Sequence, residues 1–98
     1  MDAGVSTQGP VRDNAVLSRF ELDVDGGVAF VNYRRAAEGV LALTYTEVPR
    51  HLRERGIGGQ IVQATLEAAR AQGVKVAPRC GFVAHFIAQH PEFQDLVA

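Results

Sequence analysis

The sequence predicts an α+β fold, with a small mixed sheet, a crossover helix and a C-terminal helix. Apolar and polar residues alternate strictly over Ser18–Val24, as in a strand with one buried face. Apolar residues then recur at helical spacing from Ile57 to Ala69, and a short β-rich run, Val74–Pro78, follows that helix. A strand, a helix and a strand in this order imply a right-handed crossover, so the last strand is expected to lie parallel to the one before the helix.

Three antiparallel strands are expected ahead of the long helix. The first is Ser18–Val24, and Asp25-Gly26-Gly27 then provides a turn. Val28–Arg34 is the second strand, and Val40–Val48 is the third. Pro49 ends this ladder because proline has no N–H group to donate.

Two helices follow from the remaining pattern. The longer one begins near Gly56 and ends before Gly73, which suits a left-handed C-terminal cap. The shorter one covers Gly81–Gln89, and Pro91 stops it because a proline disfavours helical geometry in the residue before it. A sheet of about four strands with two helices is therefore expected.

Residues 1–13 show no apolar period and are predicted to be a flexible N-terminal tail, so residues 14–98 form the single domain. Ten basic against 11 acidic residues give a net charge of −1, which predicts no specific binding to nucleic acid. The longest apolar runs fall short of the roughly 20 residues that a membrane span needs. The single cysteine, Cys80, cannot form an internal disulfide, so we expect a reducing, cytoplasmic location.

A basic cluster and a glycine cluster meet where the long helix begins. A helix start leaves its first N–H groups unpaired and carries partial positive charge, and glycines let phosphates approach the backbone. We therefore predict a pyrophosphate site on these amides, with a guanidinium adding charge to the phosphates. The residues concerned are Arg53, Arg55, Gly56, Ile57, Gly58 and Gly59. The alternative is a helix entry that needs unusual backbone angles, preceded by a solvated loop.

Two common phosphate-binding motifs do not fit this segment. The loop of nucleotide hydrolases needs a Lys followed by Ser or Thr after the glycines, where Gly59 and Gln60 stand here. A dinucleotide fingerprint would follow an opening parallel strand rather than three antiparallel strands.

The segment Arg53–Gly58 resembles the Arg/Gln-x-x-Gly-x-Gly/Ala motif of the GNAT superfamily of N-acetyltransferases, which binds the pyrophosphate of acetyl-coenzyme A. Three further motifs are similar, in the same order, to those of small single-domain GNAT-like proteins. They are Thr46-Glu47-Val48-Pro49, Pro78-Arg79-Cys80 and His90-Pro91-Glu92. The resemblance extends over residues 14–98.

This resemblance implies an N-acetyltransferase that uses acetyl-coenzyme A as co-substrate. It also implies that the third and fourth strands splay apart, so that backbone groups near Glu47 and Val48 bind pantetheine and the carbonyl oxygen. Tyr45, Glu47 and Cys80 would then lie near the reacting atoms. The small relatives commonly have histidine in place of Tyr45, so this chain lacks one obvious base.

Two mechanisms remain open at this stage. In one, Cys80 accepts the acetyl group, its thiolate favoured by the helix start and by the adjacent Arg79. In the other, the amine attacks directly while Glu47 or a water takes the proton. Cys80 could instead be a small buried residue. Strict alternation puts Glu47 on the same side as Leu43, where it could cap the strand through a salt bridge.

The acceptor is expected to be an exposed primary amine on a polyamine, a peptide or a protein lysine, because 98 residues leave little room for the N-terminal helices of larger GNAT enzymes. A surface or capping role is expected for His85 and His90. Cys80 has no partner cysteine, so no structural zinc site is expected. Two other functions compete: a non-catalytic coenzyme A or acyl-coenzyme A binding module, and a protein-interaction domain whose sheet edge recruits a peptide.

Overall fold

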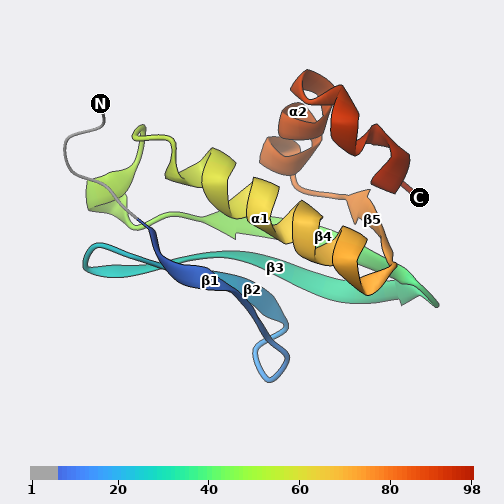
Figure 1. The fold of residues 1–98 in the computed structure, drawn as a ribbon, viewed down its shortest axis with the longest axis horizontal. Helices are drawn as coiled ribbons and strands as arrows, with labels where there is room; N and C mark the ends of the chain where they lie inside the picture. Colours follow the sequence, from blue (N-terminus) through green and yellow to red (C-terminus); the bar gives the residue numbers. More distant parts are fainter. Residues whose placement is uncertain (1–6) are drawn as a thin grey trace.

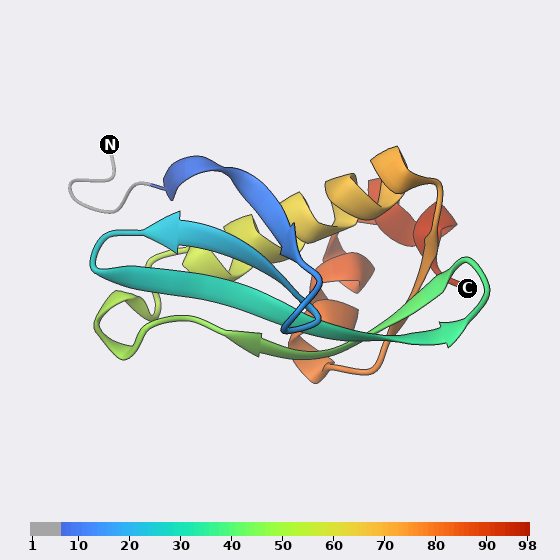
Figure 2. The same cartoon turned by 90° about the horizontal axis from the view of Figure 1, so that it is seen from below.

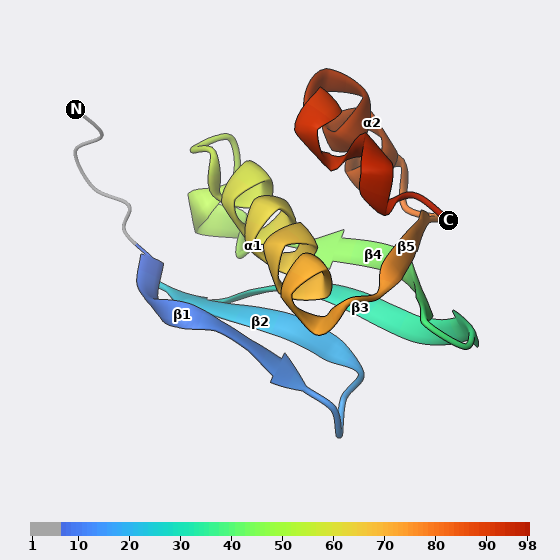
Figure 3. The same cartoon turned by 45° about the vertical axis from the view of Figure 1, so that its right-hand side comes forward.

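A computed structural model describes residues 7–98 of the chain as a five-stranded mixed sheet with both helices on one face (Figures 1 and 3). The strand order is β1-β2-β3-β4-β5, in which the first four are antiparallel neighbours and β5 is parallel to β4. The strands are β1 (Thr7–Asn14), β2 (Arg19–Val24), β3 (Gly27–Ala37), β4 (Val40–Glu47) and β5 (Lys75–Pro78). The helices are α1 (Ile57–Gln72) and α2 (Gly81–Gln89), with short 3-10 turns η1 (Arg50–Leu52) and η2 (Pro91–Leu96). The predicted mixed sheet with a crossover helix and a C-terminal helix is confirmed.

Strand β1 corrects the expected flexible tail and raises the strand count to five. Residues 7–13 belong to this strand, while residues 1–6 lie outside the described part of the chain. The pairing with β2 is interrupted between Gln8 and Arg12, and Pro10 lies within that irregularity at the edge of the sheet, where a missing N–H group is tolerated. An edge strand of this kind buries little of its own surface, so it shows no apolar alternation.

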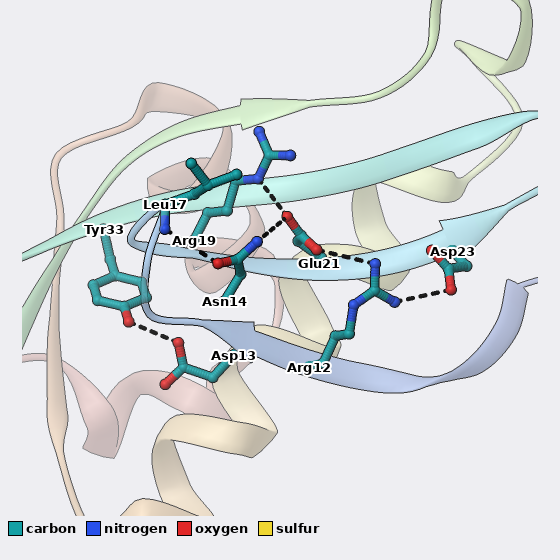
Figure 4. A network of polar contacts seen from close by, with 8 residues as sticks. All are labelled: Arg12, Asp13, Asn14, Leu17, Arg19, Glu21, Asp23 and Tyr33. Atoms are coloured by element: carbon teal, nitrogen blue, oxygen red, sulfur yellow. Dashed lines mark hydrogen bonds and ion pairs between the residues drawn. The ribbon is translucent and has the colours of Figure 1, made fainter.

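Polar side chains hold β1 against β2 (Figure 4). The guanidinium of Arg12 donates to Asp23 at 2.8 Å and to Glu21 at 3.0 Å, and the amide of Asn14 donates to Glu21 at 2.9 Å. The Nε of Arg19 donates to Glu21 at 2.6 Å. These donors, Arg19 foremost, lower the pKa of the Glu21 carboxyl even though its burial opposes them. Glu21 is therefore a buried carboxylate whose charge is fully compensated.

Helix α1 covers the sheet with one apolar face. The side chains of Ile57, Ile61, Val62, Leu66 and Ala69 are all buried in the core against the strands. Gly73 ends the helix with φ 73°, and its N–H donates to the carbonyls of the last turn. The predicted helix and its left-handed cap are confirmed. Neither α1 nor α2 has both the length and the apolar content needed to cross a bilayer.

The resemblance implied that β4 and β5 splay apart; in the structure β5 pairs with β4 over its whole length, and β4 extends beyond the end of β5. Their pairing runs from Val40 with Lys75 to Leu43 with Pro78, and β4 then continues to Glu47 with β3 as its one strand partner among the described residues. Where the pairing stops, the N–H groups of Arg79 and Cys80 both donate to the carbonyl of Leu43 at 3.0 Å. This bend directs the chain into α2 and leaves the end of β4 without a strand neighbour on that side.

A bulge in β4 overturns the alternation expected for Glu47. Tyr33 pairs with Leu43 whereas Asn32 pairs with Tyr45, so Thr44 is an extra residue in β4. The strand therefore turns over between Leu43 and Tyr45. Tyr45 and Glu47 lie on the face of the sheet that the helices leave uncovered, which Figure 2 shows from below, while Leu43 is buried on the other side.

Candidate functional site

Helix α1 begins with unpaired backbone donors. Gly56 precedes it in the left-handed region, with φ 83° and ψ 0°, and no side chain caps this end among residues 7–98. The first intrahelical bond of the turn runs from Gln60 N–H to the Gly56 carbonyl at 3.2 Å. The N–H groups of Ile57, Gly58 and Gly59 therefore have no acceptor of their own within the helix. Such a helix start suits an anion, and the left-handed Gly56 sets the direction in which it faces.

A groove of about 460 Å³, called here the first groove, opens beside this turn. One wall is the end of β4, formed by Tyr45, Thr46, Glu47 and Val48. The other comes from the loop before α1 and the first turns of the two helices, and consists of Arg53, Glu54, Gly56, Gly58, Gly59 and Phe82. The first groove thus joins the split between β4 and β5 to the open start of α1.

The carboxylate of Glu47 is held from two sides. The Tyr45 hydroxyl donates a short hydrogen bond to Glu47 Oε1, and this bond raises the pKa of Tyr45. Arg53 Nη2 lies 3.4 Å from Glu47 Oε2, and Arg53 Nε donates to the Val48 carbonyl at 3.3 Å. Arg53 therefore contacts the end of β4, whereas the sequence suggested that it would face phosphates. The arrangement offers a fixed carboxylate in the wall of a groove.

Several predicted residues lie away from this cluster. Arg55 is exposed and does not line the first groove. The side chain of Ile57 is buried at 1% exposure, so this residue offers the groove only its backbone N–H. His51, which lies in the loop before these residues, is also remote from the groove: its Nε2 lies 3.0 Å from the carbonyl of Asp25, against the turn between β2 and β3.

Cys80 is the N-terminal cap of α2 and lies behind the wall of the first groove. Its Sγ is 3.7 Å from Thr46 Oγ1, and Thr46 lines the groove. Burial raises the pKa of the Cys80 thiol, but the backbone N–H groups of Val83 and Phe82 and the Thr46 hydroxyl outweigh burial, so the pKa is lowered. The N–H groups at the start of α2 thus act on the thiol as the sequence suggested, whereas Arg79 is not among the causes of the lowered pKa. A lowered pKa increases the fraction of thiolate at neutral pH.

Sequence reasoning missed Phe82, Thr46 and Glu54. Phe82 is an apolar residue of α2 and would be expected in the core, yet it is 45% exposed and stands in the groove wall. Glu54 adopts φ 65°, which no local sequence pattern indicates. Phe82 meets the start of α1 through a contact between residues far apart in the sequence, so no motif could have revealed it.

A second groove, of about 430 Å³, lies between α1 and α2 and adjoins the first. The two share Gly56, Gly59 and Phe82. The remaining lining residues are Gln60, Gln63, His85, Phe86, Gln89 and His90.

The two histidines of α2 differ in their surroundings. His85 is exposed. The ring of His90 stacks on Phe86, with ring centroids 3.9 Å apart, and its Nδ1 lies 2.8 Å from the Phe86 carbonyl. His90 therefore caps the end of α2 while lining the second groove. Across residues 7–98, His, Cys, Asp and Glu side chains nowhere gather in threes that could hold a metal ion.

Comparisons with known proteins identify the family and the fold. The family model described as GCN5-related N-acetyl-transferase matches residues 19–96. A GCN5-like protein from Staphylococcus aureus, solved in solution by NMR, is similar over 99% of this chain and 89% of its own, with a TM-score of 0.65 and 22% identity. At that identity the likeness shows the fold alone. No curated protein matches the sequence significantly.

Proposed function

The chain belongs to the GCN5-related N-acetyltransferase family, and we propose that it transfers an acetyl group from acetyl-coenzyme A to a primary amine. The observation that carries this proposal is the start of α1. Its first N–H groups are uncapped by any side chain among the described residues, and they open on a groove that continues into the split between β4 and β5.

The open start of α1 and the two adjoining grooves support coenzyme A as the ligand. The amides of Ile57, Gly58 and Gly59 would receive the diphosphate. The end of β4 near Glu47 and Val48, which has no strand neighbour on the β5 side, would hold the pantetheine arm through its backbone. The second groove adjoins the first at Gly59, so the far end of a long ligand bound in the first groove would extend into the second.

Acetyl-coenzyme A supplies an activated thioester carbonyl when it is bound. In the direct route the amine nitrogen forms a bond to the carbonyl carbon, the carbon–sulfur bond breaks, and the leaving thiolate takes up a proton. Glu47, oriented by Tyr45 and Arg53, would accept the proton that the amine loses, either directly or through a water. Its place in the groove wall supports this role.

Cys80 supports a second route to the same product. Its lowered pKa favours the thiolate, which could form an acetyl thioester and then lose the acetyl group to the amine. Cys80 does not itself line the first groove, whereas Glu47 does. We therefore favour the direct route, and an acetyl adduct on Cys80 would reverse that preference.

The acceptor is proposed to be an amine on a polyamine, a peptide or a protein lysine. Tyr45 and Glu47 lie on the face of the sheet that no helix of residues 7–98 covers, which suits an exposed acceptor (Figure 2). The cytoplasm is the proposed compartment, because a single cysteine indicates no need for an oxidising one.

The test begins with an amide-resolved titration with acetyl-coenzyme A, followed by mass analysis of spermidine and of a lysine-containing peptide. Chemical shift changes centred on Gly56, Gly58 and Gly59, together with an acetylated amine, are expected. Glu47→Gln should lower turnover while leaving the affinity for coenzyme A nearly unchanged. Glu67→Gln, an exposed carboxylate on the outer surface of α1, is the matched control and should leave both unchanged.

The outcomes separate the candidate functions. Saturable binding at these amides without acetylation of any amine would make the chain a coenzyme A binding module. No binding, or shift changes confined to another surface, would contradict the proposal and favour a protein-interaction domain.

A further inference from the structure

Phe82 is an aromatic residue whose side chain is not buried in the core. It lies in the first turn of α2, and its 45% exposure contrasts with the burial of Val83, Phe86 and Ile87 on the same helix. It is also one of the residues that line both grooves. A large apolar ring in this position gains its full burial only when something occupies the groove beside it.

The ring of Phe82 meets α1 at Gly58. A Cβ atom added to Gly58 would lie 2.7 Å from Phe82 Cζ and 3.1 Å from Cε2, and the first of these is closer than carbon atoms pack in proteins. The ring therefore occupies the space that any side chain at position 58 would need. The backbone of Gly58 is helical, so its conformation alone does not require glycine.

The other glycines at this helix start have different surroundings. Gly56 has φ 83°, and an added Cβ would meet nothing within 4 Å. A Cβ on Gly59 would lie 3.6 Å from Phe86 Cε2, which is an ordinary contact. Conformation thus accounts for Gly56, whereas steric conflict with an aromatic ring singles out Gly58.

We propose that Phe82 is a ligand-positioning residue and that position 58 is glycine because the ring of Phe82 is seated on it. In that seat the ring forms the wall common to both grooves and offers its exposed face to a ligand that passes from one to the other. This inference deepens the proposed function and rests on it for the ligand, coenzyme A. It assigns to Gly58 a role distinct from allowing phosphates to approach the backbone.

Alanine at position 58 would displace the ring rather than the helix. Phe82 Cζ is the far end of a half-exposed side chain, so rotation of the ring relieves the conflict without movement of the backbone. The displaced ring would no longer pack against position 58, and the shape of the wall common to both grooves would change. In the Phe82→Ala background, the methyl group added at position 58 meets no ring. Gly58→Ala then stabilises the helix through the higher helix propensity of alanine.

The experiment is a double-mutant cycle of the wild type, Gly58→Ala, Phe82→Ala and the double variant, each measured for coenzyme A affinity by calorimetry and for thermal midpoint. Gly58→Ala should weaken binding about tenfold in the wild type, which corresponds to about 1.4 kcal/mol, and should cause no further loss when Phe82 is alanine. It should also raise the midpoint by about 4 °C in the Phe82→Ala background and by clearly less in the wild type. Gly81→Ala, where an added Cβ meets nothing within 4 Å, is the control and should leave affinity unchanged.

Equal losses of affinity from Gly58→Ala in both backgrounds would show that the glycine serves phosphate approach, and would overturn the inference. Undiminished affinity in Phe82→Ala would overturn it as well. If none of the four proteins binds coenzyme A, the proposed function fails. The thermal midpoints then still decide whether Gly58 and Phe82 are coupled, because that measurement needs no ligand.

Discussion

Replacement of Gly56 by alanine tests whether the left-handed residue before α1 sets up the binding site. Gly56 has φ 83°, and an added Cβ would meet nothing within 4 Å, so the cost comes from the backbone alone. An L-residue in this region costs about 1–2 kcal/mol. In a domain of this size each kcal/mol lowers Tm by about 4–8 °C.

This strain divides between stability and ligand affinity. If the alanine variant keeps the left-handed conformation when free, the whole cost lowers Tm; if it relaxes, binding must restore that conformation, and the full 1–2 kcal/mol corresponds to a loss of affinity of about 5- to 30-fold. Thermal unfolding followed by circular dichroism measures the first effect, and calorimetric titration with coenzyme A measures the second.

Gly39→Ala is a matched control for this prediction. Gly39 has φ 74°, and a Cβ atom added to it would also meet nothing within 4 Å. It stands just before Val40, the first residue of β4, at the opposite end of that strand from the first groove. Gly39→Ala should therefore lower Tm by a similar amount while leaving affinity unchanged. Costs to stability and to affinity in Gly56→Ala that sum to well below about 1 kcal/mol, or a Gly39→Ala protein that loses affinity as Gly56→Ala does, would refute the reasoning.

Three further predictions concern charge and nucleophilicity. Thr46→Val removes a donor that lowers the pKa of the Cys80 thiol, so the pH midpoint of alkylation by iodoacetamide should rise; an unchanged midpoint would mean that the hydroxyl does not act on the sulfur. Glu21→Gln should destabilise the protein to urea at pH 7, whereas Glu67→Gln should not. Because the pKa of Glu21 is lowered in the folded state, its contribution is full above the ordinary carboxyl pKa of about 4.3 and is lost as the pH falls through the lower value. The gap in stability between wild type and Glu21→Gln should therefore narrow in acid, and a constant gap from pH 7 to pH 3 would contradict this assignment.

Much of the fold could be predicted because its signals are local. The strand β2 and the helix α1 each show their own period in the sequence, since each buries one face along its whole length. Gly73 marked the end of α1 because a left-handed cap has its own residue preference. The location of the candidate site was predictable for the same reason, because Gly56 and Gly58 stand at a change of period from strand to helix.

Features that depend on a distant partner were not predictable. Strand β1 contributes Val11 to the edge of the core and is otherwise held by ion pairs and hydrogen bonds to β2, so residues 7–13 gave no periodic signal. The bulge at Thr44 exists only in relation to β3, and a single extra residue moved Glu47 to the opposite face of the sheet.

The sequence by itself determined the strands β2 to β5, the two helices and the place of the uncapped helix start, because periodicity and glycine placement act within a few residues. Only the tertiary structure decided that Arg53 contacts Glu47, that Thr46 reaches the sulfur of Cys80, and that Phe82 sits on Gly58. These contacts follow from how the end of β4 separates from β5 and how α2 then packs beside α1. The packing of the whole core fixes that arrangement, and no single segment of the sequence specifies it.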